Sequence, residues 1–253
     1  MAEAKKKLKT KDEIIKAGLK PPLCILGTAP SLKDAPWEDE CMEFWGVSTV
    51  KNFPGFGKMD RAFEMHPKRY WGQPAFYDQM LEFEGPIYMQ DVYEEIPNSV
   101  KYPYDEIRKK FYMPCMGENL FVTNSITWMI LLAIHEGYRD ISFYGVHMAH
   151  NTEYGYQRAS CSWALGIMQG MDAMGDKFNI YIPPESELMR ARYEYGYQEP
   201  TKEMEYVQGR IEGLTAGVQQ VGAEVRKLDE QRLKTEGALY EAKVILEHIA
   251  GYN

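Results

Sequence analysis

The chain has 253 residues, of which 45% are hydrophobic, and it carries a formal net charge of −8. This composition allows a full hydrophobic core, and the acidic balance argues against a broad electrostatic contact with nucleic acid. No window approaches the roughly 18 consecutive apolar residues of a membrane span, and the basic run at 5–11 lacks the apolar stretch of a signal peptide. We therefore expect a soluble, cytoplasmic protein whose partner is neither a membrane nor a nucleic acid.

We expect residues 1–20 to form a basic N-terminal arm or helix. It precedes a region, 21–200, in which short apolar runs alternate with helical patterns. The runs that predict strands are Leu23–Leu26, Phe44–Val50, Arg61–Met65, Ile87–Gln90, Ile141–Val146 and Phe178–Ile182. Helices are predicted over 125–136 and 154–174. Strands joined by helices of this length indicate an α/β domain with a mostly parallel sheet and helices on both faces, that is, a Rossmann-like fold.

The four cysteines, Cys24, Cys41, Cys115 and Cys161, show no paired spacing. Cys24 and Cys161 lie in apolar surroundings, where a thiol acts as a small hydrophobic group. This usage favours a reducing compartment without a disulfide framework.

The first predicted strand ends at Gly27 in a turn of small residues, GTAPSL. Ligands of parallel α/β sheets bind at the carboxyl ends of the strands, so this turn lies where a site is expected. Thr28 and Ser31 offer hydroxyls, the turn offers backbone amides, and Pro30 restrains the backbone. These groups suit an anion such as a phosphate. A plain strand-to-loop turn is the alternative, because neither G-x-G-x-x-G nor a Walker A lysine is present.

A second polar segment opens the most apolar helix. Thr123, Asn124 and Ser125 are N-cap residue types, apolar side chains follow on almost every side, and Gly137 supplies the stop. The next predicted strand then leads to His147, so this segment and the first turn are expected to meet at one edge of the sheet.

The order and spacing of LCILGTAPSLKD, FWGVSTVKNF, RAFEMHP and VTNSITWMILLAIHEGYRDISFYGVHM resemble a group of Rossmann-like nucleotide binders, over about residues 22–197. That group includes the bacterial and phage sialyltransferase family and the methanopterin diphosphokinase-like proteins, and compact phage proteins of this type look similar. The resemblance implies a metal-independent glycosyltransferase that needs no cofactor. Its substrate would be a CMP- or UDP-linked sugar, and its place the host cytoplasm if the protein is phage-encoded.

The same resemblance implies roles for individual residues. His66 and His147 would be the catalytic candidates. The residues that would bind the nucleotide are Gly27, Thr28, Pro30, Ser31, Thr123, Asn124, Ser125, Tyr154 and Tyr156.

Departures from the family pattern leave alternatives open. His147 replaces an acidic residue of the family, and the inserted lid that carries its catalytic base is missing. His150 and Glu153 therefore join His66 and His147 as candidates for the base. The spacing of His147, His150 and Glu153 also resembles a metal site, although a set of four ligands is lacking. One alternative function is a non-catalytic phage protein that binds or sequesters a nucleotide or has a structural role. Another is a Mg²⁺-dependent pterin or nucleotide phosphotransferase with carboxylates at the rim.

The segment 201–253 has a different pattern. Apolar residues recur in steps of four and three from Val207 to Ile249, interrupted only by Arg232 and Thr235. Such heptads predict a coiled coil, and β-branched a positions with leucine at d favour a parallel homodimer through residues 207–249. Alternatives are an antiparallel hairpin that folds back near 232–237, or contact with another protein.

Overall fold

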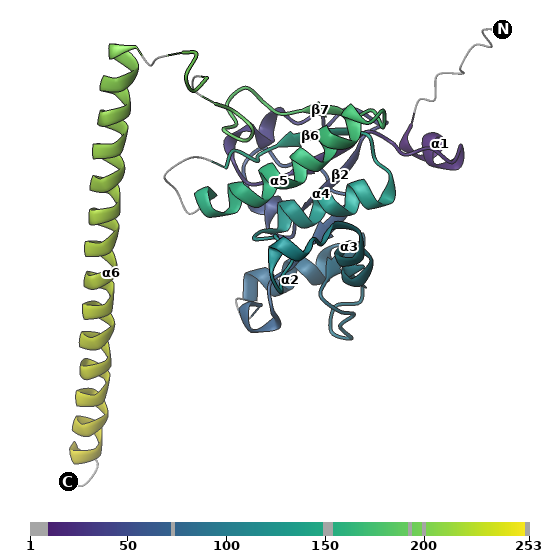
Figure 1. Ribbon diagram of the computed structural model, residues 1–253. Coiled ribbons are helices and arrows are strands. Elements are labelled where there is room, and N and C mark those ends of the chain that lie inside the picture. Colours follow the sequence, from purple (N-terminus) through teal and green to yellow (C-terminus); the bar gives the residue numbers. More distant parts are fainter. Residues whose placement is uncertain (1–9, 72–73, 149–153, 192–193, 199–200, 251–253) are drawn as a thin grey trace, which may run out of the picture. The chain divides into compact units, whose positions relative to one another are not determined.

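The computed structural model describes residues 10–71, 74–148, 154–191, 194–198 and 201–250 (Figure 1). The chain divides into two compact units, Met1–Arg190 and Ala191–Asn253. The boundary predicted at residue 200 lies inside the second unit.

The first unit is built on one sheet of seven parallel strands in the order β5-β4-β3-β2-β1-β6-β7. The strands are β1 (Leu23–Leu26), β2 (Glu43–Val47), β3 (Arg61–Phe63), β4 (Ile87–Met89), β5 (Ser99–Lys101), β6 (Asp140–Tyr144) and β7 (Asn179–Tyr181). The chain steps outward from β1 to β5 and then crosses to the other side of β1 with β6. This order confirms the predicted Rossmann-like α/β fold and places its switch point between β1 and β6.

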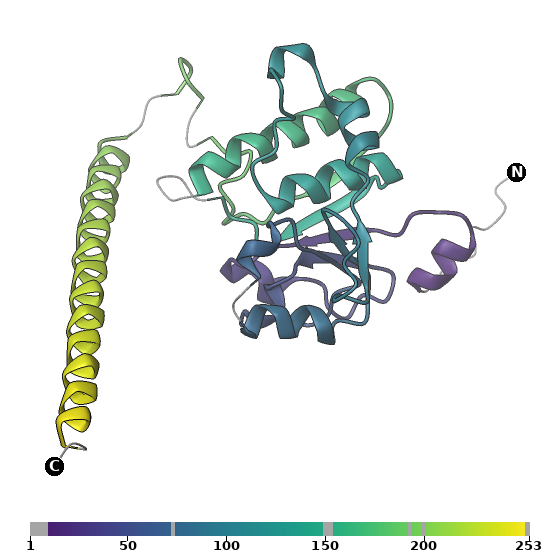
Figure 2. The ribbon, with the colours of Figure 1, turned by 90° about the horizontal axis from the view of Figure 1, so that it is seen from below.

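Helices cover both faces of this sheet, as predicted. On one face, α4 (Ser125–Glu136) and α5 (Tyr154–Ala173) lie side by side (Figure 2). The short helices of this unit are α1 (Lys11–Lys16), α2 (Pro74–Glu82) and α3 (Tyr104–Phe111). Leu23 and Ile25 pack in the hydrophobic core between the sheet and the helices α4 and α5. Cys24 and Leu26 pack on the other face of the sheet, against the 3₁₀ turn Pro30–Asp34. The strand β1 is therefore buried on both sides, as its unbroken apolar run indicates.

The helix α4 forms where the sequence predicts it because both of its ends carry strong signals. Asn124 caps the first turn, and Gly137 ends the helix with φ +90°. Its apolar residues from Met129 to Ile134 are all buried. Burial also raises the pKa of the Cys24 thiol to about 12 and that of Cys161 to about 11, which fits their predicted role as inert apolar groups.

The second unit contains α6 (Lys202–Ala250), one continuous helix of 49 residues. Its continuity excludes the alternative of a hairpin near 232–237. The apolar residues of the heptad stripe are exposed along it, from Val207 at 50% to Ile249 at 58%. Within the part of the chain that the structure describes, no helix is long and apolar enough to cross a membrane.

Candidate functional site

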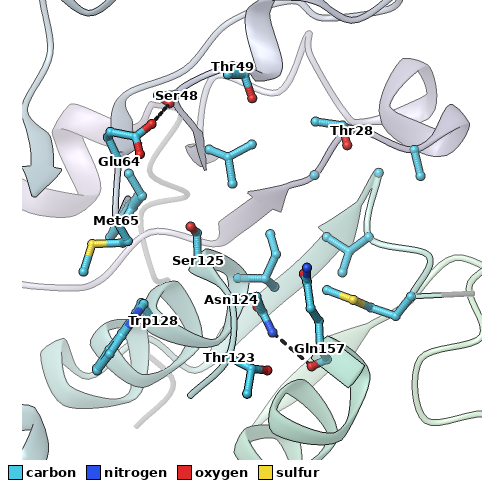
Figure 3. A pocket seen from close by; sticks show the side chains of 18 of the residues that line it. Thr28, Ser48, Thr49, Glu64, Met65, Thr123, Asn124, Ser125, Trp128 and Gln157 are labelled. Atoms are coloured by element: carbon cyan, nitrogen blue, oxygen red, sulfur yellow. Dashed lines mark hydrogen bonds between the residues drawn. The ribbon is translucent and has the colours of Figure 1, made fainter. Parts of the chain in front are cut away.

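A cavity of about 770 Å³ opens at the carboxyl edge of the sheet (Figure 3). Its walls are the segments that follow β1, β2, β3 and β6, together with the first turn of α4 and one residue of α5. The two polar segments that the sequence analysis singled out therefore meet at this cavity.

Two glycines lie where the backbones that follow the parallel strands β1 and β6 come into direct contact. The N–H of Gly27 donates to the carbonyl of Tyr144 at 2.8 Å, and the N–H of Ala29 donates to the carbonyl of Gly145 at 2.9 Å. A Cβ added to either Gly27 or Gly145 would lie 2.3 Å from the carbonyl oxygen of the other, and Gly145 has φ +71°. Both positions require glycine, because the two backbones are in direct contact beside the cavity.

We expect Gly145→Ala to lower the free energy of unfolding by about 2–5 kcal/mol, from overpacking and from the left-handed backbone. Gly137→Ala is the matched control, since Gly137 also has a positive φ but no atom within 4 Å of an added Cβ. The control should lose only about 1–2 kcal/mol. Equal losses of unfolding free energy for the two variants in chemical denaturation would show that the contact between Gly27 and Gly145 is not closely packed.

Four polar side chains line the cavity from four different parts of the chain: Thr28 after β1, Thr49 after β2, Ser125 at the start of α4 and Gln157 on α5. Figure 3 shows their polar atoms directed toward the space between them. Among the residues that the structure describes, none hydrogen-bonds these four side chains. Together with the amino-terminal amides of α4, they offer unpaired donors to the oxygens of a ligand.

Thr123 and Asn124 also line the cavity, but their polar atoms hold α4 against α5. Asn124 Oδ1 accepts from the N–H of Thr127 at 2.8 Å, and Asn124 Nδ2 donates to Gln157 O and Ser160 Oγ, both at 3.0 Å. The Oγ1 of Thr123 lies 2.8 Å from the same Ser160 hydroxyl. These bonds fix the positions of Ser125 and Gln157, the residues beside them that carry free polar groups.

We expect Asn124→Ala to cost about 1–3 kcal/mol of stability, because it removes the helix cap and leaves buried partners unpaired. Asn124→Ser retains a capping oxygen but lacks the amide donor, so it should lose less. Thermal and urea denaturation measure both variants. An alanine variant as stable as the wild type would contradict the role of Asn124 in joining the two helices.

Ser31 lies behind the cavity wall and does not line it. Its hydroxyl, in a residue only 2% exposed, accepts from the N–H of Gly145 at 2.9 Å and lies 2.9 Å from Nε2 of His147. Pro30 opens the same 3₁₀ turn and is likewise outside the lining. Within this turn the hydroxyl that lines the cavity belongs to Thr28, whereas the hydroxyl of Ser31 holds His147 at the cavity.

The position of Tyr156 also differs from the expectation. Tyr156 is 76% exposed and outside the cavity lining, because the helical phase of α5 turns the adjacent Gln157 inward instead. Tyr154 begins α5, and its side chain lies outside the part that the structure describes, as do His150 and Glu153.

The sequence reasoning missed Glu64, which lies beside the predicted His66. The Glu64 side chain is 1% exposed and the His66 side chain 63% exposed, and Glu64 Oε1 lies 2.7 Å from Nδ1 of His66. This hydrogen bond raises the pKa of His66, with burial opposing it. The available signal was the alternation of Glu64 and His66 at the end of a strand, which places both on one side of the chain.

No group of three or more histidine, cysteine, aspartate or glutamate side chains within the described ranges could hold a metal ion. Among His147, His150 and Glu153, whose spacing resembles a metal site, only His147 belongs to the residues that the structure describes.

Comparison with solved structures finds sialyltransferase structures. CstII from Campylobacter jejuni with cytidine-5'-monophosphate is 16% identical, with a TM-score of 0.46, and the match covers 73% of this chain and 96% of that one. CstII with CMP-3FNeuAc gives the same values. The sialyltransferase CST-II with a trisaccharide acceptor and CMP is 14% identical, with a TM-score of 0.44, and the match covers 72% of this chain and 96% of that one. Comparisons with protein-family models and with curated proteins found no match. Similarity at this level identifies neither a ligand nor a reaction for this chain.

Proposed function

We propose that this chain binds a nucleotide sugar in the cavity and transfers the sugar without a metal ion, as a sialyltransferase-like glycosyltransferase. The observation that carries the proposal is the convergence of Thr28, Thr49, Ser125 and Gln157, all without partners among the described residues, on one cavity. A volume of about 770 Å³ is in the range of sites that enclose small molecules.

The phosphate would lie between the turn at Thr28 and the start of α4 at Ser125. Both hydroxyls donate, and the positive end of the helix dipole favours the negative charge that develops on a departing nucleotide phosphate. The apolar part of the lining, which includes Phe53, Val122 and Trp128, would contact the base or the sugar.

A phosphotransferase is the weaker candidate on this geometry. It would use carboxylates at the rim to hold Mg²⁺. The described lining contains one carboxylate, Glu64, and its oxygens already bond Ser48 and His66.

Calorimetry with CMP, CMP-linked sugars and UDP-linked sugars tests the ligand class. We expect one nucleotide family to bind, and Ser125→Ala and Thr28→Val to weaken its affinity about 10- to 100-fold through loss of hydrogen bonds to a charged group. Ser162→Ala is the matched control, because Ser162 lies on α5 outside the cavity lining and should leave the affinity unchanged. If no nucleotide binds, the proposal fails. Tight binding without donor turnover would favour the non-catalytic nucleotide-binding function.

We also propose that α6 pairs with α6 of a second copy. The apolar residues at the a and d positions of its heptads are exposed in the single chain, including Ile211 at 42%, Leu214 at 60% and Leu228 at 64%. A second copy would cover this stripe, because the heptad register matches itself.

A further inference from the structure

A buried carboxylate lies directly beneath an accessible imidazole at the edge of the cavity. Glu64 follows the last residue of β3, and its side chain is 1% exposed, whereas the side chain of His66 is 63% exposed. Both residues belong to the cavity lining. A carboxylate so far removed from water requires hydrogen-bond donors around it.

Three donors surround Glu64. Its Oε2 accepts from the Ser48 hydroxyl at 2.5 Å, and its Oε1 accepts from the backbone N–H of His66 at 2.9 Å and lies 2.7 Å from His66 Nδ1. The parallel pairing of β2 with β3 brings Ser48 to this position, and the Ser48 N–H also donates to the carbonyl of Phe63 at 3.1 Å. Both carboxylate oxygens of Glu64 are therefore held by hydrogen bonds, and Oε1 also faces the imidazole of His66 as an acceptor.

The orientation of the imidazole follows from this bond. Because a carboxylate only accepts, the hydrogen on His66 lies on Nδ1, and Nε2 carries the free lone pair. None of the described residues bonds Nε2. The indole Nε1–H of Trp71 donates to the carbonyl of His66 at 3.1 Å. The ring of Tyr70 packs edge-on against the imidazole of His66, with 6.2 Å between the ring centres. The backbone and the ring of His66 are thus both restrained while Nε2 stays accessible.

We propose that Glu64 is a positioning residue that fixes His66 as the Nδ1–H tautomer, and that His66 Nε2 is the general base of the transfer. The second half of this inference rests on the proposed function. In the step, Nε2 takes the proton of the attacking hydroxyl, and that oxygen forms a bond to the anomeric carbon. The bond from this carbon to the phosphate oxygen breaks, and its electron pair leaves with the nucleotide phosphate.

The pH dependence of such a base has a definite direction. The groups that face His66 are Glu64, directly after β3, and Tyr70 from the following 3₁₀ turn, and the hydrogen bond to Glu64 raises the pKa of His66 above its ordinary value. Only neutral His66 accepts a proton, so the rate falls as the pH drops through the pKa of the folded state. Glu64→Gln keeps the shape and an acceptor but removes the charge, so the acidic limb of the pH–rate profile should move to lower pH.

The positioning role is tested without any substrate by ¹⁵N NMR of the histidine ring nitrogens in the full chain. We expect neutral His66 to be protonated on Nδ1 in the wild type and its titration to move to lower pH in Glu64→Gln. His66→Ala assigns the His66 signals by their loss, and His135→Ala is the control that should leave them in place, because His135 is an exposed residue of α4. A wild-type His66 protonated on Nε2, or an unchanged titration in Glu64→Gln, would overturn the role of Glu64.

The base role is tested by turnover of the donor that binds in calorimetry. We expect His66→Ala to lose about 10²- to 10⁴-fold in kcat. Glu64→Gln should lose activity with the shifted pH profile, while its affinity for that donor stays within about twofold of the wild type. Glu82→Gln, on an exposed carboxylate paired with Lys51, is the control and should leave turnover unchanged. Full activity of His66→Ala would overturn the base role. If the wild type binds no nucleotide, both the proposed function and the base role of His66 fail. The NMR result then still decides whether Glu64 positions His66.

Discussion

Replacement of Arg61 by leucine is expected to lower the free energy of unfolding by about 3–5 kcal/mol, because it leaves a buried carboxylate without its cation. Arg61 Nε donates to Glu43 Oε1 at 2.8 Å, and its Nη1 donates to Glu136 Oε1 at 2.9 Å. Glu43 is 4% exposed. The guanidinium also lies 4.5 Å from the ring centre of Trp45, so the loss includes stacking as well as charge.

The measurement is urea denaturation of Arg61→Leu, with the double variant Arg61→Leu/Glu43→Gln as its control. The double variant should recover part of the loss, because the unpaired buried charge is gone, although Glu43 also accepts hydrogen bonds from Trp45 and Tyr138. Glu43 and Arg61 are the first residues of β2 and β3, at the end of the sheet opposite the cavity. Nucleotide affinity of the folded fraction should therefore be unchanged. A loss below about 1 kcal/mol would mean that the pair contributes no more than a surface ion pair.

Substitution of Leu228 by aspartate is expected to abolish self-association of the chain. Leu228 occupies a d position of α6 and is 64% exposed in the single chain, and a charge there would be buried in a paired coil. Full burial of each large apolar side chain contributes about 1.5–3 kcal/mol, so the stripe from Val207 to Ile249 can support a stable assembly. Light scattering and sedimentation of both proteins measure the mass.

Ala223→Asp is the matched control for this prediction, since Ala223 lies at the outer f position of the same heptads and should leave the mass unchanged. Arg232→Leu should strengthen the assembly, because Arg232 interrupts the a positions and bonds only Asp229 and Glu236 of its own helix among the described residues. A wild-type chain that sediments as a monomer at all concentrations would end the proposal that α6 pairs with a second copy.

Much of the fold could be predicted because local signals agree with the tertiary structure. The apolar run Leu23–Leu26 and the helix between Asn124 and Gly137 form with the predicted bounds, since each has a clear beginning and end in sequence. Predicted strands such as Ile141–Val146 run past their observed ends, because apolar residues continue into the loops that line the cavity. The strand Ser99–Lys101 was not predicted, since three residues with one apolar side chain carry no periodic signal.

The site was predictable as a meeting of segments, but not in the roles of its side chains. Strand-end logic brings the turn at Thr28 and the helix start at Ser125 to one edge of the sheet. The hydrogen bond between Ser31 and His147 cannot be predicted in this way, because it depends on the 3₁₀ turn that follows β1. Nor can strand-end logic pair Glu64 with Ser48, which lies 16 residues away and reaches it only through the register of β2 and β3.

No lysine or arginine belongs to the cavity lining within the part of the chain that the structure describes. An anionic ligand there would be held by neutral donors and backbone dipoles, in a protein whose net charge is −8. The affinity for an anionic ligand should then change little with ionic strength, in contrast to the affinity of sites built from clustered cations. Added salt should instead speed the encounter, because it screens the long-range repulsion between an acidic protein and an anion.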